Sequence, residues 1–236
     1  MLLGLVAVAV VLFLIMGAVA GLLGSDGGDD GDGQPGGGDP AAIQPLPEGH
    51  PALELARRDA DDPLALGEAD APVVMIEYSD FQCAFCGMHA RGTHVELIDE
   101  YVEQGLLRIE FRNFPINGPE SDAAARAAWA AGRQGRFWEF YEAAFAEDAH
   151  MDSGKFGEEG LRALAEEAGV PDVESLLTEM ESEEAGEAVG RDAEEAMDLG
   201  IVSPPSFLLN GHPLPGARPV EEFRDTIDQL LAAADE

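Results

Sequence analysis

The chain has few cations and only two cysteines. Its 236 residues include 13 Lys and Arg against 47 Asp and Glu, which gives a formal net charge of −34, and Lys155 is its one lysine. Nucleic-acid binding and polybasic membrane-surface binding both need a concentrated positive patch, so this charge excludes both classes of protein. Two cysteines are also too few for a disulfide scaffold or for a four-cysteine zinc site.

The acidic residues are spread along the whole chain and do not form a tail. At this net charge a folded domain repels itself unless salt screens the charges, and the screening length falls to about 3 Å in 1 M salt. The composition therefore predicts a protein adapted to very high salt, from a halophile. The alternative is an unusually acidic protein from an organism that lives at ordinary salt.

Residues 1–23 carry no charged side chain and would span about 35 Å as a helix, which is enough to cross a bilayer. Ala18-Val19-Ala20 has the small-x-small form of a signal-peptide cleavage site. We expect an uncleaved transmembrane anchor, with the rest of the chain on the extracellular side. A cleaved signal would change the attachment and leave the compartment the same, because the protein would then be secreted.

Residues 24–51 have the composition of a flexible linker. The stretch 24–39 contains eight Gly and five Asp, so it cannot bury apolar surface. Its aspartates lack the spacing and the closing glutamate of a calcium-binding loop. Because 46% of the whole chain is hydrophobic, a real core is available, and we place one folded domain at 52–236.

The folded part alternates strand-like and helical segments. In order we expect a strand at 73–79, a helix from the cysteines to about Gln104, a strand at 106–114, helices across 121–199, strands at 206–209 and 213–216 around an Asn210-Gly211 turn, and a helix at 219–233. This order, βαβ and later ββα, predicts an α/β fold with a mixed central sheet and a helical insertion at about 119–199.

Cys83 and Cys86 follow directly after the first strand, at the start of a helix. The unpaired N–H groups and the positive dipole at a helix N-terminus favour thiolate over thiol, so the pKa of a cysteine there falls. We expect Cys83 to be the exposed nucleophile and Cys86, one turn further in, to be the resolving thiol. Such a pair cycles between dithiol and disulfide through a mixed disulfide with a substrate protein.

The cysteine pair has two other interpretations, a structural disulfide and a metal site, and the sequence favours neither. A purely structural disulfide would stabilise little, because so short a loop removes little chain entropy. A metal site would need His89 as a third ligand, yet on a straight helix His89 lies about 240° around from Cys83, and His94 lies about 16 Å further along. We therefore assign no metal site and no cofactor, and none of the five histidines receives a catalytic role.

Four stretches of the sequence carry a family resemblance: APVVMIEYSDFQCAFC at 71–86, AARAAWAAGRQGRFWEFYEAAF at 124–145, SPPSFLLNG at 203–211 and LPGARPVEEF at 214–223. Together they resemble the DsbA-like branch of the thioredoxin superfamily, especially its membrane-anchored or secreted bacterial and archaeal forms. The resemblance implies a thioredoxin-like fold and a thiol–disulfide oxidoreductase. Combined with the charge, it points to a haloarchaeal source.

The resemblance also assigns roles to individual residues. Cys83 and Cys86 match the redox pair, and the register of SPPSF matches Pro205 to the cis-proline that lies against that pair and presents the substrate strand. Glu77 matches a buried acid that aids proton transfer from the resolving cysteine. Pro204 stands where the family usually offers a backbone N–H to the substrate; proline has none, so one substrate hydrogen bond should be lost.

The dipeptide between the cysteines is Ala84-Phe85, which we expect to contact substrate. The strongest oxidants of the family have a histidine there, so its absence favours a less oxidising couple. The resemblance predicts an extracytosolic, membrane-tethered monomer that oxidises cysteine-containing exported proteins and is reoxidised by a membrane quinone-linked partner. A reductase or isomerase on the same fold, and a non-enzymatic carrier of Cu(I) on the two thiols, remain as alternatives.

Overall fold

The computed structural model describes residues 43–147 and 151–234. The segment 1–23, predicted as an anchor, and most of the predicted linker lie outside those residues. Within the described ranges no helix is both long and apolar enough to cross a bilayer. Folded contacts begin inside the segment predicted as linker, since the Ile43 N–H donates to Gln229 Oε1 at 2.8 Å and the Ile43 side chain packs on the core.

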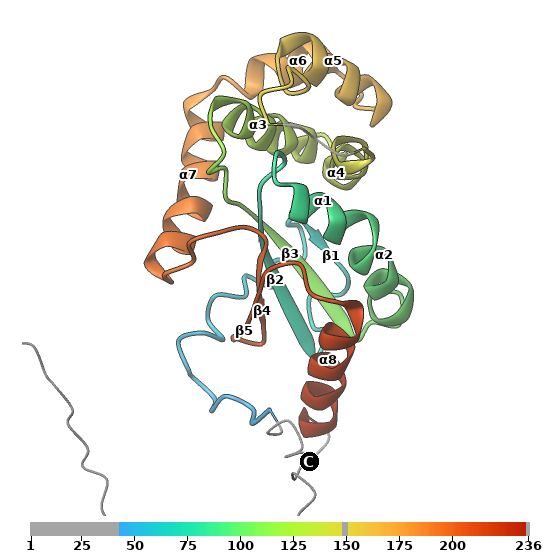
Figure 1. The fold of residues 1–236 in the computed structure, drawn as a ribbon, viewed down its shortest axis with the longest axis vertical. Coiled ribbons are helices and arrows are strands. Elements are labelled where there is room, and N and C mark those ends of the chain that lie inside the picture. Colours follow the sequence, from blue (N-terminus) through green and yellow to red (C-terminus); the bar gives the residue numbers. More distant parts are fainter. Residues whose placement is uncertain (1–42, 148–150, 235–236) are drawn as a thin grey trace, which may run out of the picture. The chain divides into compact units, whose positions relative to one another are not determined.

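A five-stranded mixed sheet forms the centre of the described fold, in the order β1-β3-β2-β4-β5 (Figure 1). The strands are β1 (Ala65–Leu66), β2 (Val73–Ser79), β3 (Leu107–Asn113), β4 (Ser206–Leu209) and β5 (His212–Pro215). Strands β2 and β3 are parallel, and the other neighbours are antiparallel. The predicted mixed sheet is confirmed, and β1 is an added edge strand that is too short to give an alternating pattern in the sequence.

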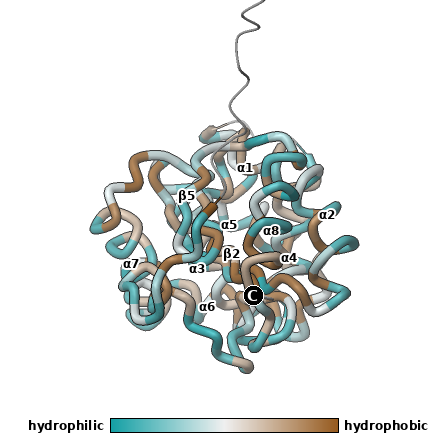
Figure 2. The backbone as a smooth tube through the Cα atoms, turned by 90° about the horizontal axis from the view of Figure 1, so that it is seen from below, coloured by the Kyte–Doolittle hydropathy of each residue, from teal (hydrophilic) through white to brown (hydrophobic). Residues whose placement is uncertain are grey.

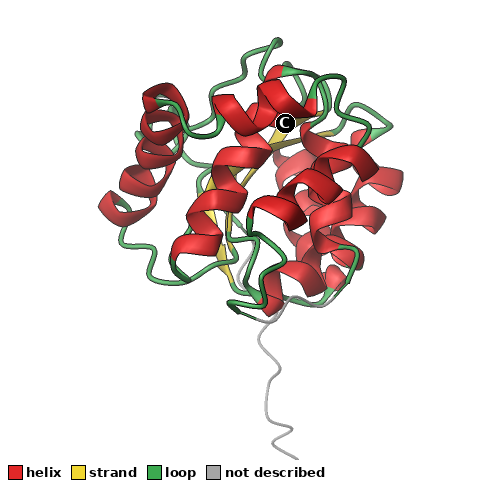
Figure 3. Cartoon of the chain, turned by 90° about the horizontal axis from the view of Figure 1, so that it is seen from above, coloured by secondary structure: helices red, strands yellow, loops and turns green. Residues whose placement is uncertain are grey.

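Helices cover both faces of this sheet (Figure 3). They are α1 (Ala84–Arg91), α2 (Thr93–Leu97), the π-helix η1 (Ile98–Val102), α3 (Pro119–Arg133), α4 (Phe137–Phe145), α5 (Glu158–Glu167), α6 (Val173–Glu179), α7 (Glu183–Asp198) and α8 (Val220–Ala234). Helices α3 to α7 occupy the segment predicted as the insertion. The hydrophobic residues of β2 lie near the centre of the molecule (Figure 2).

Strand β2 is buried on both sides, as its continuous apolar run predicted. Val73 and Met75 pack with residues of α2, η1 and α8 on one face, whereas Val74 and Ile76 pack against α7 on the other. Because side chains alternate along a strand, Glu77 points to the same face as Met75, beneath α1 and α2.

The expectation of one helix from the cysteines to about Gln104 is wrong. Gly92 leaves helical geometry, with φ −120° and ψ −93°, so α1 ends at Arg91 and α2 starts at Thr93. The next turn is a π-helix, η1, which winds wider than an α-helix. The break changes which side chains of this segment face the sheet, and this matters for His89 and His94 below.

Candidate active site

The cysteine pair lies where β2 ends and α1 begins, at the top of the sheet in Figure 1. Cys83 is the N-cap of α1, with extended backbone angles, and its Sγ accepts a hydrogen bond from the Cys86 N–H at 3.3 Å. An N-cap side chain satisfies an N–H that the helix leaves unpaired, so Cys83 occupies the position at which negative charge is best stabilised. Both cysteines are free thiols.

The two thiols differ in exposure and acidity. Cys83 is half-buried and Cys86 is completely buried. Hydrogen bonds from the Cys86 thiol and from the N–H groups of Cys86 and Phe85 outweigh partial burial and lower the pKa of Cys83. Burial, and then the neighbouring Cys83, raise the pKa of Cys86 well above its ordinary value. An attacking thiol has to be accessible and readily ionised, as Cys83 is, whereas a resolving thiol can be shielded and protonated, as Cys86 is.

The loop before β4 contacts Cys83. The peptide bond between Pro204 and Pro205 is cis, as the resemblance implied for Pro205, and the Pro204 carbonyl oxygen lies 3.5 Å from Cys83 Sγ. Two exposed apolar side chains lie close in sequence to these residues: Phe85, two residues after Cys83, is 62% exposed, and Val202, two residues before Pro204, is 85% exposed.

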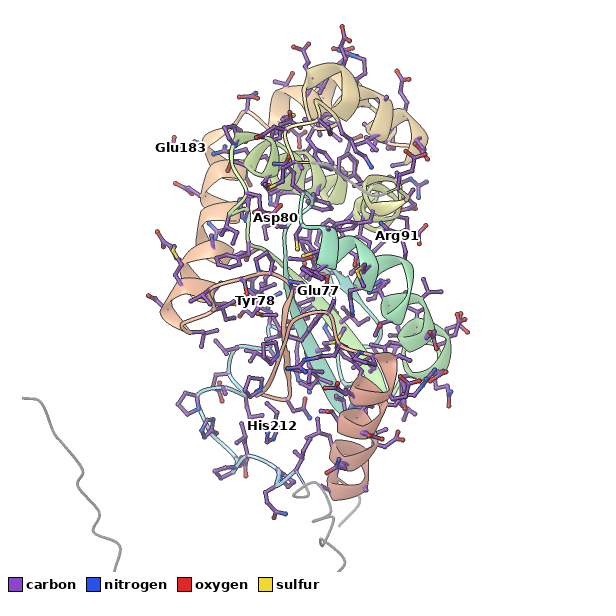
Figure 4. The ribbon with its side chains drawn as sticks, in the orientation of Figure 1. Glu77, Tyr78, Asp80, Arg91, Glu183 and His212 are labelled. Carbon is purple, nitrogen blue, oxygen red and sulfur yellow. The ribbon has the colours of Figure 1, made fainter. Side chains whose placement is uncertain are left out.

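Asp80 fixes the approach to the cysteines (Figure 4). Its buried carboxylate accepts hydrogen bonds from the Gln82 N–H at 2.8 Å and the Ser121 hydroxyl at 2.6 Å through Oδ1. Oδ2 accepts from the N–H groups of Ile116 and Asn117 at 2.8 and 3.0 Å, and from the Asn117 amide at 2.9 Å. One side chain thus joins the active-site loop to the loop after β3 and to α3.

Glu77 lies completely buried beneath α1 (Figure 4). Its Oε1 accepts a hydrogen bond from the Tyr141 hydroxyl at 3.4 Å. Burial raises the pKa of Glu77 to about 7, against the lowering effect of the nearby Ser79 and Tyr141 hydroxyls. The buried position agrees with the resemblance, and the role in proton transfer from Cys86 stays a prediction.

Sequence reasoning missed two histidines in this region. His89 and His94 are buried, with His89 Nε2 3.8 Å and His94 Nδ1 3.9 Å from Glu77 Oε2. Burial lowers the pKa of both, so both imidazoles are neutral at neutral pH. On a straight helix, residues five apart lie about 140° from each other, so only the break at Gly92 turns both rings to Glu77. That glycine was the one signal in the sequence.

The sequence profile of the family described as Thioredoxin matches residues 59–229. This chain belongs to the thioredoxin family.

Curated relatives of this thioredoxin-family chain include the probable disulfide bond formation protein D of Bacillus cereus. It is 31% identical over 152 residues, which cover 63% of this chain and 70% of that protein. The Na(+)/H(+) antiporter NhaA of Herminiimonas arsenicoxydans is 33% identical over 151 residues, and the match covers 64% of this chain but 23% of the antiporter. The similarity thus concerns less than a quarter of the antiporter.

Solved structures agree with this assignment. Oxidised BdbD from Bacillus subtilis superimposes with a TM-score of 0.67 at 22% identity, covering 72% of this chain and 92% of that one. A thioredoxin-like oxidoreductase from Silicibacter pomeroyi gives a TM-score of 0.64 at 31% identity, covering 74% and 95%. With the Cys83–Cys86 geometry, these relatives establish the thioredoxin-family chain as a thiol–disulfide oxidoreductase.

In this thioredoxin-family enzyme, alkylation by iodoacetamide should depend on pH through Cys83 alone. Because the pKa of Cys83 is lowered and that of Cys86 is raised, one thiol per reduced chain should react, with an inflection below the ordinary value of 9.0. Mass spectrometry at a series of pH values measures this. In Cys86→Ala, which removes the thiol that donates to Cys83, the inflection should move to higher pH. An inflection at or above 9.0 in the unaltered chain would contradict the assignment of roles.

Asp80→Ala should destabilise the fold and slow thiol exchange. It leaves the buried Gln82 N–H and the buried Ser121 hydroxyl without their acceptor, at about 2 kcal/mol of unfolding free energy. Denaturant unfolding measures the loss, and exchange with a small disulfide measures the rate. Asp70→Ala, which removes an exposed loop carboxylate, is the matched control and should change neither quantity. An Asp80→Ala variant that is as stable as the control would contradict this role of Asp80.

Proposed function

We propose that this enzyme is an extracytosolic, membrane-tethered disulfide oxidase for exported proteins. The observation that carries the proposal is the stabilised thiolate of Cys83: its Sγ accepts the Cys86 N–H at 3.3 Å and its pKa is lowered. A couple whose reduced form is stabilised is the more oxidising one. The names of the relatives called disulfide bond formation protein D support the same direction.

The oxidation would proceed in two exchanges. A client thiolate attacks Cys83 Sγ of the Cys83–Cys86 disulfide, so a mixed disulfide forms and Cys86 leaves and takes up a proton. A second client thiolate then attacks the client sulfur of the mixed disulfide and releases Cys83 as a thiolate. The client loses two electrons and gains a disulfide, while the enzyme gains two electrons. A membrane quinone-linked partner would accept those electrons and restore the Cys83–Cys86 disulfide.

The surface around Cys83 suits an unfolded client. The exposed rings and aliphatic groups of Phe85, Met88 and Val202 offer apolar contact to cysteine-bearing segments that a folded protein would bury. Ala84 is exposed beside them, and the Pro204 carbonyl is placed to accept a backbone N–H from the client. Pro204 cannot donate in return, so these apolar contacts would carry more of the binding.

A reductase or isomerase on the same fold is the second candidate. The observation that favours it is the Ala84-Phe85 dipeptide, which supplies no cationic or imidazole group next to the Cys83 thiolate. The thiolate is then stabilised by helix N–H groups and the Cys86 thiol alone. For a two-electron couple, about 1.4 kcal/mol of thiolate stabilisation changes the reduction potential by about 30 mV. A few kcal/mol therefore decide whether the couple oxidises or reduces its clients.

We also propose that the enzyme works outside the cell membrane. Residues 1–23 would tether a monomer to the cell membrane, with 24–51 as spacer and the catalytic domain outside. The net charge of −34, with twelve arginines and one lysine, would suit a halophile that surrounds the domain with molar salt. A membrane-impermeant maleimide applied to intact cells after mild reduction should label Cys83; failure to label while lysed cells are labelled would contradict the extracellular placement.

The oxidase proposal is tested by mixing the oxidised full chain with a reduced, unfolded client protein in molar salt, without glutathione. An oxidase should transfer its disulfide stoichiometrically, so client thiols disappear as enzyme thiols appear. The Cys83→Ser/Cys86→Ser variant is the matched control and should transfer nothing. If the oxidised chain leaves the client reduced, while the reduced chain readily opens client disulfides, the reductase interpretation is correct.

A further inference from the structure

Glu77, His89 and His94 converge in the core from three different elements. Glu77 comes from β2, His89 from α1 and His94 from α2, and one ligand-type atom of each lies within 4.8 Å of the others. Glu77 Oε2 is 3.8 Å from His89 Nε2 and 3.9 Å from His94 Nδ1. None of the three is more than 3% exposed. These distances are too long for hydrogen bonds between the groups.

Several polar atoms of this cluster have no protein partner. Within the described residues, Glu77 Oε2, both ring nitrogens of His89 and His94 Nδ1 are buried without a hydrogen bond. Each such atom costs about 1–3 kcal/mol if nothing satisfies it, and native cores leave few of them. Three side chains that each leave an atom unpaired, aimed at one point, indicate a shared ligand at that point.

Aromatic packing holds the two imidazoles in place. The His94 ring stacks on Trp138 with centroids 5.4 Å apart and lies 5.0 Å from the Tyr141 ring. The His89 ring lies 4.4 Å from Phe207 and 5.4 Å from Phe223. Neither ring can turn away to find another partner without displacing a buried ring. The cluster is therefore preorganised, which lowers the cost of binding a ligand there.

We propose that Glu77 Oε2, His89 Nε2 and His94 Nδ1 form a buried site for a divalent late first-row metal ion such as Zn²⁺. Two imidazoles and one carboxylate are a donor set that such ions prefer, and three protein ligands leave a fourth position open. Bonds of about 2.1 Å place tetrahedral ligands about 3.4 Å apart. The observed 3.8 and 3.9 Å separations need to shorten by a few tenths of an ångström, and the two imidazole nitrogens, which lie within 4.8 Å of each other, also have to approach to about 3.4 Å.

An entry route runs along α2 and α4. A groove of about 390 Å³ has His94 and Tyr141 among its lining residues, and the exposed acids Asp99 and Glu142 lie at its rim together with Arg91. The groove thus borders the His94 ring, whose Nδ1 is buried, and an ion would have to pass between the lining side chains, beside two carboxylates that attract cations. Tyr141 donates to Glu77 Oε1, which leaves Oε2 as the free oxygen.

The ion would join β2, α1 and α2 across the helix break at Gly92, directly beneath the active-site helix. Its ligands are separate from the thiols, because neither Cys83 nor Cys86 belongs to the cluster. In the metal-bound form Glu77 would be a ligand and would not exchange a proton with Cys86. The inference does not depend on the direction of thiol exchange.

The test uses the full chain carrying Cys83→Ser and Cys86→Ser, so that thiols cannot bind the metal. After incubation with Zn²⁺, a wash in molar salt with a weak chelator removes ions held by surface carboxylates. Metal analysis should then find about one Zn²⁺ per chain, and the melting temperature should rise on loading. Glu77→Gln and His94→Gln in the same background should each lower the bound Zn²⁺ at least about tenfold.

His212→Gln is the matched control, because His212 lies on β5, well away from Glu77 (Figure 4), and its loss should leave the Zn²⁺ content unchanged. X-ray absorption of the Zn²⁺-loaded Cys83→Ser/Cys86→Ser chain should show oxygen and nitrogen ligands, two of them imidazoles. This measurement does not depend on the ligand variants, which could fold poorly. No retained Zn²⁺, a shell of carboxylates alone, or equal loss in His212→Gln would overturn the proposal. Disulfide transfer is measured separately on the cysteine-containing chain, so each result stands alone.

Discussion

Cys83→Ser should abolish disulfide exchange, with a loss of at least about 1,000-fold, because Cys83 holds the reachable sulfur with a lowered pKa and Cys86 is buried. Cys86→Ser should behave differently. It keeps the attacking thiol but removes the group that resolves the intermediate, so mixed disulfides with client proteins should accumulate. Non-reducing gels of cell extracts, followed by mass spectrometry of the captured species, measure both outcomes.

Ala232→Ser is the matched control for these two variants. It adds a hydroxyl at an exposed position of α8 without removing a thiol, so exchange should continue and no mixed disulfide should accumulate. Full exchange activity in Cys83→Ser would contradict the assignment of the nucleophile. If Cys86→Ser captures no client while Cys83→Ser is inactive, the resolving role of Cys86 is wrong.

Glu110→Gln should lower the unfolding free energy at neutral pH by about 3 kcal/mol. The buried carboxylate of Glu110 accepts N–H groups of Arg57 and Arg58 at 2.9 and 2.8 Å, and guanidinium groups of Arg108 and Arg112 at 2.9 and 2.7 Å. Burial opposes the charge, but these donors prevail and lower the pKa of Glu110 to about 2. The glutamine amide is uncharged and has one acceptor oxygen in place of two. The buried guanidinium groups of Arg108 and Arg112 therefore lose their counter-charge.

The same shift sets a pH dependence with a definite sign. A carboxyl whose pKa is lowered on folding stabilises the fold above its unfolded value of 4.5, and this contribution is lost as pH falls toward 2. The 2.5-unit difference, 4.5 − 2, corresponds to about 3 kcal/mol. Denaturant unfolding between pH 7 and pH 2 should therefore show the stability gap between the parent and Glu110→Gln closing in that window.

Glu103→Gln, which alters an exposed glutamate, is the control. Its unfolding free energy should depend on pH in the same way as that of the parent. A gap that persists at pH 2, or a Glu110→Gln variant as stable as the parent at pH 7, would contradict the account. Molar salt should not remove the effect, because the Glu110 and Arg112 side chains are fully buried and salt screens exposed charges.

The sheet and the cysteine pair followed from local patterns. The uninterrupted apolar run at 73–76 predicted a central strand, and the Asn210-Gly211 turn predicted the hairpin of β4 and β5. The placement of Cys83 at a strand-to-helix junction predicted its capping position. Each of these features depends on residues close together in the chain, which is why sequence reasoning could reach them.

The histidine cluster could not be reached in the same way. It depends on the helix break at Gly92, and a glycine within a helical pattern does not by itself show whether the helix continues. The buried charges around Glu110 depend on backbone N–H groups of Arg57 and Arg58, which lie before β1 and far away in sequence. Tertiary contacts decide both features, and neither has a spacing that the sequence displays.

The central claim, that Cys83 and Cys86 form an oxidising couple, is tested most directly by their reduction potential. It is measured on the full chain in molar salt, by equilibration with a series of reduced and oxidised glutathione mixtures. The account predicts a potential less negative than about −220 mV, because helix N–H groups and the Cys86 thiol stabilise the Cys83 thiolate. A value near −270 mV, typical of thioredoxin, would contradict the oxidase proposal and make the enzyme a reductase.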